Sequence, residues 1–467
     1  MGCIAWPNQY DQLLIQMARA QQWSLDWMSA DEINAKESIM GRFFFSILLL
    51  CLLSGDALCQ QFRIPDLQEL PRIDRRSPRP GRDVLRNSAF ILKLNEHRPA
   101  GDQYVILTDH TASGFLDPLQ KLAEHRNGSI INVADLGEIY QTQTLQSLRN
   151  QLRQLKPKFI AIAPRMESYR ENMLLGVWEL ISSLDDDKYL DVYPGLLLAS
   201  TPKSFQRLID RTIHFQSISQ KELKPMAISQ VPSNAESRSL QKAGILRNVF
   251  GSYGIPTPVL AIYTPAANAA PVIEGDLTWE IRLKEKGRFV TSFEPDPRDA
   301  IQRAQLVIMH GHGIPGMSCS IDVDGIPTTS SNQIVLSGSC FGAVPAESDF
   351  PTMTSAPGGY QVKPRQAFAT RYVDRGATVF FGHMRLSSGF PHLFPVLEKW
   401  MAGKSVGQAY QELINGLIDM RGFQPGKFVV KNAGQQRRIP QNALLYVVLG
   451  DPALIPLRPL IKMDGKK

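Results

Sequence analysis

Short apolar runs alternate with amphipathic stretches along most of this 467-residue chain, beginning near residue 103. Apolar runs of this length predict buried strands, and apolar residues recurring every three or four positions predict helices. The expected strands are residues 104–107, 130–133, 159–163, 196–199, 259–263, 289–291, 305–309, 333–336, 378–381 and 446–449. The expected helices are residues 115–126, 144–155, 172–184, 202–215, 366–375, 393–401 and 406–420.

The alternation of strands with helices predicts an α/β fold built on parallel sheets. We expect two stacked parallel-sheet subdomains with helices on both faces. The first is expected at residues 87–235 and the second at residues 236–457. The junction is placed within residues 221–258, where helix-like and polar stretches interrupt the alternation.

Residues 43–53 form an apolar run that follows Arg42 and precedes small residues. The run is too short to span a bilayer comfortably, and this arrangement is typical of a secretory signal peptide. We assign residues 40–59 to that signal and residues 1–39 to a misassigned start or an extension. In the alternative, the extension is genuine and the run is a membrane anchor. We expect the mature chain to begin near Leu58 or Gln60. Amino-terminal sequencing of exported protein measures this, and recovery of residues 1–39 would contradict it.

The signal predicts a secreted, periplasmic or cell-surface protein without a stable membrane span after cleavage. Residues 60–86 are rich in Arg and Pro and read as a linker, and residues 458–467 form a basic tail. The formal net charge is +7, but the basic residues are scattered rather than interleaved with aromatic ones. We therefore expect no nucleic-acid partner. The chain also has no phosphate-binding loop, no Gly-x-Gly-x-x-Gly that opens a helix after the first strand, and no serine nucleophile elbow.

Two neighbouring apolar runs stop at reactive side chains. Residues 305–309 lead into His310, Gly311, His312 and Gly313, and residues 333–336 lead towards Cys340. The carboxyl ends of neighbouring parallel strands meet at one edge of a sheet, where ligands bind in open α/β folds. This arrangement would place a base beside a thiol, as nucleophilic cysteine catalysis requires.

These residues resemble the gingipain-like family of caspase-fold cysteine peptidases. The resemblance extends to residues 187–195, 376–382 and 449–454, although the family's Gly-Arg pair is Gly195-Leu196 here. It implies a secreted cysteine endopeptidase that acts on a protein or peptide without a cofactor. It also implies that Cys340 is the nucleophile and His312 the general base. The backbone N–H groups of Gly313 and Cys340 are then expected to form the oxyanion hole.

Each of these residues has a structural alternative. Cys340 could be a small buried side chain or half of a disulfide with Cys319, a reversible latch in an oxidising compartment. Cys319 and His310 are candidates for positions behind the dyad, and His310 is also a candidate core histidine or metal ligand. These residues and His312 lack the close pairing of a zinc site, so we expect no metal. For the whole chain, the alternative is a non-catalytic relative acting as a binding or assembly module.

Overall fold

The computed structural model describes residues 97–231, 301–311, 313–319, 321–329, 332–347, 366–385, 390–424 and 440–459, with short pieces at 250, 255, 259–263, 280–281, 283–284, 288–289, 349–350, 360–362, 387 and 428. The chain divides into two compact units. Nearly all described residues belong to the unit made of Arg75–Lys284, Phe289–Asp349 and Gln361–Lys467. The predicted extension, signal peptide and linker lie outside the described residues. No described helix is long and apolar enough to cross a membrane.

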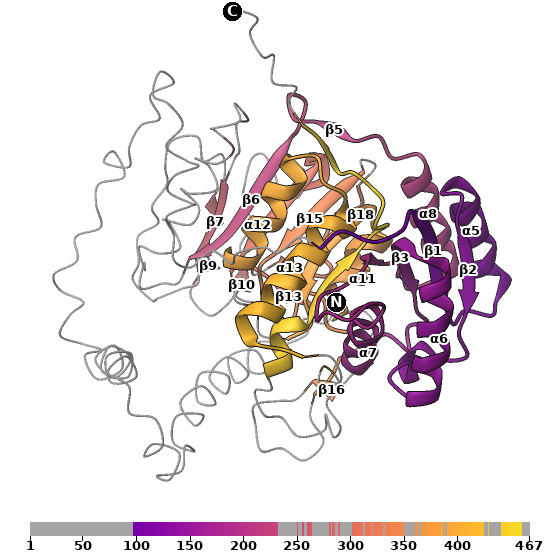
Figure 1. Ribbon diagram of the computed structural model, residues 1–467. Coiled ribbons are helices and arrows are strands. Elements are labelled where there is room, and N and C mark those ends of the chain that lie inside the picture. The colour runs from indigo at the N-terminus through magenta and orange to yellow at the C-terminus, as the bar shows by residue number, and fades with distance from the viewer. Residues whose placement is uncertain are drawn as a thin grey trace, which may run out of the picture. The chain divides into compact units, whose positions relative to one another are not determined.

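This unit is built on one eleven-stranded sheet with the order β2-β1-β3-β4-β19-β18-β15-β11-β6-β7-β8 (Figure 1). The apolar runs form its strands because their side chains are buried in the sheet. The strands are β1 (Gln103–Thr108), β2 (Ser129–Asn132), β3 (Pro157–Ala163), β4 (Tyr193–Leu196), β6 (Pro225–Val231), β7 (Val259–Tyr263), β8 (Glu280–Ile281), β11 (Leu306–His310), β15 (Gln333–Ser337), β18 (Ala377–His383) and β19 (Tyr446–Leu449).

Strand β19 joins two groups of parallel strands into this sheet. It runs parallel to β4, where Leu449 pairs with Leu196, and antiparallel to β18, where Tyr446 pairs with His383. The amino ends of β1, β3 and β4 therefore lie at the same edge as the carboxyl ends of β11, β15 and β18. The predicted α/β class is confirmed. Where two separate sheets were expected, the structure has one continuous sheet. The predicted boundary at residue 235 lies outside the described residues and stays a prediction.

Helices cover both faces of the sheet. Helices α5 and α6 lie on opposite faces, because right-handed crossovers carry the chain to β2 on one side of β1 and then to β3 on the other. Helix α8 packs on α5 and α11, whereas α7 packs on α6 and α13 covers β4 and β19. Figure 1 shows α12 and α13 lying together in front of the sheet. The helices are α5 (Ser113–His125), α6 (Thr142–Leu155), α7 (Glu171–Ile181), α8 (Pro202–Ile213), α11 (Phe368–Asp374), α12 (Phe390–Met401) and α13 (Val406–Arg421).

Shorter elements complete the described structure. Strands β12, β13 and β14 form a small antiparallel sheet, and β5 pairs with β20. The bounds are β5 (Ile218–Ser219), β9 (Leu283–Lys284), β10 (Arg288–Phe289), β12 (Gly313–Ile314), β13 (Met317–Ser318), β14 (Ile321–Asp322), β16 (Asp349–Phe350), β17 (Tyr360–Gln361) and β20 (Leu457–Arg458), with 3-10 turns η2 (Leu136–Glu138) and η4 (Pro440–Leu444).

The structure corrects the strand predictions in two places. Strand β6 was not predicted, although it pairs with β11 on one side and β7 on the other. Its sequence begins with Pro225 and carries Ser229 and Gln230, which weaken the apolar signal of a central strand. Strand β4 spans Tyr193–Leu196 rather than residues 196–199. The apolar residues 197–199 are buried beyond the end of the strand. Their apolar character reflects burial, which does not require a strand.

Candidate active site

Cys340 lies just beyond the carboxyl end of β15, where the sheet meets a tight turn. Strand β15 pairs in parallel with β11, so that Met309 is opposite Ser337. The predicted adjacency of these two strands is therefore confirmed. The side chain of Cys340 is partly exposed, in contrast to the fully buried strand residues that lead to it.

Gly313 packs directly against the backbone of Cys340. A Cβ atom added to Gly313 would lie 2.1 Å from the carbonyl oxygen of Cys340 and 2.9 Å from Cβ of Ser339, so no other residue fits without displacing this backbone. Gly313 also pairs with Ser318 in the small antiparallel sheet. His312 lies outside the described residues, and its predicted role stays a prediction. The residue that follows it in the chain is nevertheless in contact with Cys340.

The turn after Cys340 contains an unusual backbone conformation. Phe341 has φ of 55°, in the left-handed region that non-glycine residues seldom adopt. Its N–H donates to the carbonyl oxygen of Arg385 at 2.9 Å, which helps to hold the turn. Such strain is worth about 1–3 kcal/mol and clusters at functional sites. The conformation turns the chain sharply at the thiol.

Residues that precede and begin α7 also support the turn after Cys340. The hydroxyl of Tyr169, which is 1% exposed, donates to the carbonyl oxygen of Ala343 at 2.8 Å. Glu171, the first residue of α7, forms an ion pair with Arg385. Both contacts join segments that are far apart in the sequence. They hold the segments that follow β15 and β18, on either side of the Cys340 turn, from a part of the chain outside the β11–β15 pair.

Among the described residues, Ser387 contacts the Cys340 thiol. Its backbone N–H lies 3.4 Å from Sγ of Cys340, and its hydroxyl is 3.0 Å from the hydroxyl of Tyr446. The Tyr446 hydroxyl is in turn 2.6 Å from Nδ1 of His392. Burial lowers the pKa of His392 to about 4, so this imidazole is neutral near pH 7. Ser387 could not be predicted from the sequence, because it follows β18 and reaches Cys340 only when β18 pairs with β15.

Behind Cys340, buried hydroxyl groups connect the turn to the small antiparallel sheet. Ser318 Oγ donates to Ser339 Oγ at 2.8 Å and lies 3.3 Å from Ser337 Oγ. Cys319 is fully buried, with Sγ 3.4 Å from Ser339 Oγ. Neither Cys319 nor Cys340 is in a disulfide. The reversible Cys319–Cys340 latch and its alternative, a buried Cys319 thiol, both stay predictions.

The remaining predicted residues are placed only in part. His310 is 8% exposed at the end of β11, opposite Ser229 of β6, a position that suits a core histidine. The oxyanion-hole roles of the Gly313 and Cys340 N–H groups stay predictions. Asp451, which follows β19, accepts the backbone N–H of Ala453 at 3.0 Å, as a turn residue does. Leu196 is 1% exposed within β4.

Burial raises the pKa of the Cys340 thiol, and the N–H of Ser387 offsets part of that rise. Deprotonation therefore needs a more alkaline pH than for an ordinary cysteine. We expect the rate of Cys340 alkylation by iodoacetamide to rise with pH and to reach half its maximum above the midpoint of a free cysteine peptide. Mass spectrometry of the labelled peptide across pH 5–11 measures this. A rate already maximal at pH 5 would instead show a preformed thiolate beside a cationic partner.

Comparisons with known proteins show how distant this chain is from them. No family model and no curated protein matches it. Among solved structures it is similar to the Arg-specific cysteine proteinase gingipain R, with 12% identity, a TM-score of 0.49, and 78% of this chain and 81% of that one covered. A second match is ornithine carbamoyltransferase from Burkholderia thailandensis, with 12% identity, a TM-score of 0.19, and 60% and 85% coverage. These similarities are too low to assign an activity.

Proposed function

We propose that this chain is a cysteine-type endopeptidase with Cys340 as nucleophile and His312 as general base. The observation that carries the proposal is the packing of Gly313 on the backbone of Cys340 at the shared ends of β11 and β15. His312 is one peptide unit from Gly313, so its Cα is about 3.8 Å from a residue in contact with the nucleophile. The resemblance of these segments to gingipain-like peptidases supports the same pair.

The chemistry follows from a thiol that is neutral at rest. His312 accepts the proton as Sγ of Cys340 bonds to the peptide carbonyl carbon, giving a tetrahedral intermediate. The intermediate collapses as the C–N bond breaks, and His312 returns the proton to the leaving amine. Water then attacks the thioester carbon with His312 as the base, the C–S bond breaks to release the acid, and His312 returns the proton to Sγ of Cys340. N–H groups of Gly313 and Cys340 are the proposed donors to the oxyanion.

Further proposals concern where the enzyme acts and what it cleaves. The substrate is a protein or peptide, and no cofactor takes part in the proposed step. The apolar run at residues 43–53 supports export of the chain. We therefore propose a peptidase that works outside the cytoplasm.

The rival proposal is a non-catalytic binding or assembly module, which burial of the Cys340 thiol favours because it raises the pKa. A library of fluorogenic peptides, incubated with the full chain under reducing conditions, separates the two proposals. We expect turnover of a subset of peptides, and stoichiometric labelling of Cys340 by an electrophilic peptide derived from the best substrate. No turnover across the library, with an intact fold, would overturn the peptidase proposal.

A further inference from the structure

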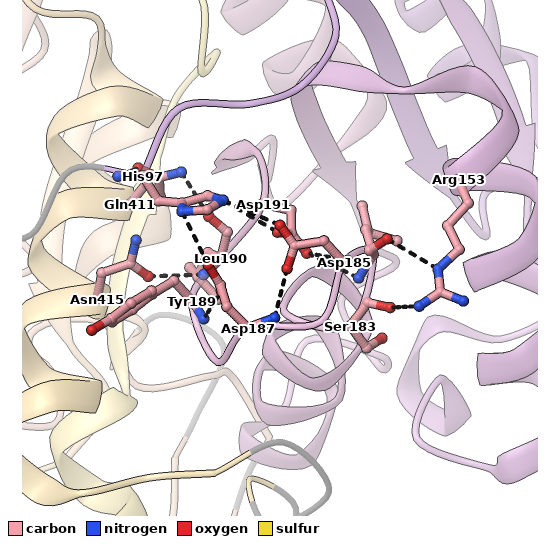
Figure 2. A network of polar contacts seen from close by, with 11 residues as sticks. His97, Arg153, Ser183, Asp185, Asp187, Tyr189, Leu190, Asp191, Gln411 and Asn415 are labelled. Carbon is pink, nitrogen blue, oxygen red and sulfur yellow. Dashed lines mark hydrogen bonds and ion pairs between the residues drawn. The ribbon is translucent and has the colours of Figure 1, made fainter.

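The side chain of His97 converges with those of three aspartates, Asp185, Asp187 and Asp191, on the loop between α7 and β4 (Figure 2). The imidazole of His97 lies in the middle. Its Nε2 is 3.5 Å from Oδ2 of Asp185 and 3.4 Å from Oδ1 of Asp191, and its Nδ1 is 3.4 Å from Oδ2 of Asp187. One ligand atom from each of the four residues lies within 4.8 Å of all the others. Such a set has the dimensions of a metal site.

The loop backbone aims these carboxylates. Oδ1 of Asp185 accepts the N–H of Asp187 at 2.9 Å, and Oδ1 of Asp187 accepts the N–H of Tyr189 at 2.7 Å. Oδ2 of Asp191 accepts the N–H groups of Leu184 at 2.9 Å and Asp185 at 3.2 Å. Each carboxylate thus uses one oxygen to hold the loop and turns its other oxygen towards the His97 ring. Figure 2 shows these oxygens facing the imidazole.

Asp191 supplies independent evidence for a missing ligand. The residue is 7% exposed, and its Oδ1 is buried and accepts no hydrogen bond from any described residue. The contact of that oxygen within the group is the His97 ring nitrogen, at 3.4 Å. A buried carboxylate oxygen without a hydrogen bond is unfavourable unless a cation compensates it. This oxygen points into the space that the other three residues surround.

The cationic side chains nearby are engaged elsewhere. Lys188 Nζ lies 2.7 Å from Oδ1 of Asp419. Arg153 donates to the carbonyl oxygens of Ser183 at 2.8 Å and Leu184 at 3.0 Å, so it holds the loop without touching the carboxylates (Figure 2). Neither side chain neutralises the three aspartates. The negative charge of the three aspartates is therefore available to bind a divalent cation.

We propose that His97, Asp185, Asp187 and Asp191 bind one Mn²⁺ or Zn²⁺ ion. Calcium and magnesium take oxygen ligands, whereas one imidazole nitrogen with three carboxylate oxygens suits a first-row transition metal. The ion fastens residue 97 to the loop before β4. Gln411 of α13 already bridges the same two segments, since its Oε1 accepts the His97 N–H at 3.3 Å and its Nε2 donates to the Leu190 carbonyl oxygen at 2.7 Å.

The test is titration of chelator-treated full-length protein with MnCl₂, ZnCl₂, CaCl₂ and MgCl₂ in separate calorimetric experiments. We expect one Mn²⁺ or Zn²⁺ per chain, and a rise in the unfolding temperature of about 5 °C at saturation. His97→Ala and Asp185→Asn should weaken binding at least about 10-fold and remove the thermal shift, because each deletes a ligand. Both positions are partly exposed, so these variants should fold.

Asp186→Asn is the matched control, because Asp186 is an exposed neighbour in the same loop that is outside the four-residue group. It should bind the ion with unchanged affinity. Binding of calcium alone with no effect of His97→Ala, equal affinities in all variants, or no binding would each overturn the proposal. Cys340→Ala should bind the ion like the wild type, so the result is independent of the proposed peptidase activity.

Discussion

Cys340→Ala is expected to lower peptide hydrolysis by about 10⁴-fold or more, because no other group can form the thioester. The unfolding temperature should stay within about 3 °C of the wild type, since the thiol is partly exposed and its contact to Ser387 comes from a backbone N–H. Steady-state assays with the best library peptide, alongside calorimetric scans, measure both quantities. Loss of activity with an intact fold identifies a chemical role.

Cys340→Ser is the companion variant. Serine keeps the shape of the side chain but is a far weaker nucleophile without a base matched to it. We therefore expect it to be nearly as inactive as the alanine variant. Wild-type turnover in either variant would show that the thiol only packs in the turn, and the nucleophile assignment would be wrong.

Arg126→Met is expected to reduce the free energy of unfolding by about 3 kcal/mol, because it leaves a buried carboxylate without its cation. Asp451 is fully buried, and its Oδ2 accepts hydrogen bonds from Nε and Nη2 of Arg126. Its Oδ1 accepts from the hydroxyl of Tyr104 at 2.9 Å. Arg126 is 23% exposed, which places the loss at the low end for a buried pair. Urea unfolding monitored by circular dichroism measures it.

Lys121→Met on helix α5, which ends just before Arg126, provides the control, because Lys121 is exposed. It should change the free energy of unfolding by no more than about 0.5 kcal/mol. Adding Asp451→Asn to Arg126→Met should recover part of the loss, since it removes the unpaired charge. Equal effects of Arg126→Met and Lys121→Met would contradict the argument that this ion pair stabilises the fold.

Much of the fold could be read from the sequence, because parallel strands buried on both faces leave uniform apolar runs. Strands β1, β3, β11, β15 and β18 were found in this way. Strand β6 was missed because Pro225, Ser229 and Gln230 dilute its apolar character, although it lies between two other strands. Sequence periodicity reports local composition, and the position of a strand within a sheet depends on distant partners.

The candidate site was predictable only where its residues follow strands that are neighbours. Cys340 and the segment around Gly313 come together because β11 and β15 pair. Ser387 reaches the thiol from beyond β18, and Glu171 reaches Arg385 from α7. The group around His97 was not predicted, because His97 and its three aspartate neighbours are far apart in the sequence and come together only in the folded chain. Such contacts depend on the register of whole strands.

The position of β19 has a consequence for the order in which this protein assembles. Strands β4 and β18 both border β19, so each has an unpaired edge until residues 446–449 have been synthesised and have inserted. Open strand edges pair readily with other chains. In the growing chain the edge of β4 is open from residue 196 onward and that of β18 from residue 383 onward, and a truncation before Tyr446 leaves both edges open to aggregation.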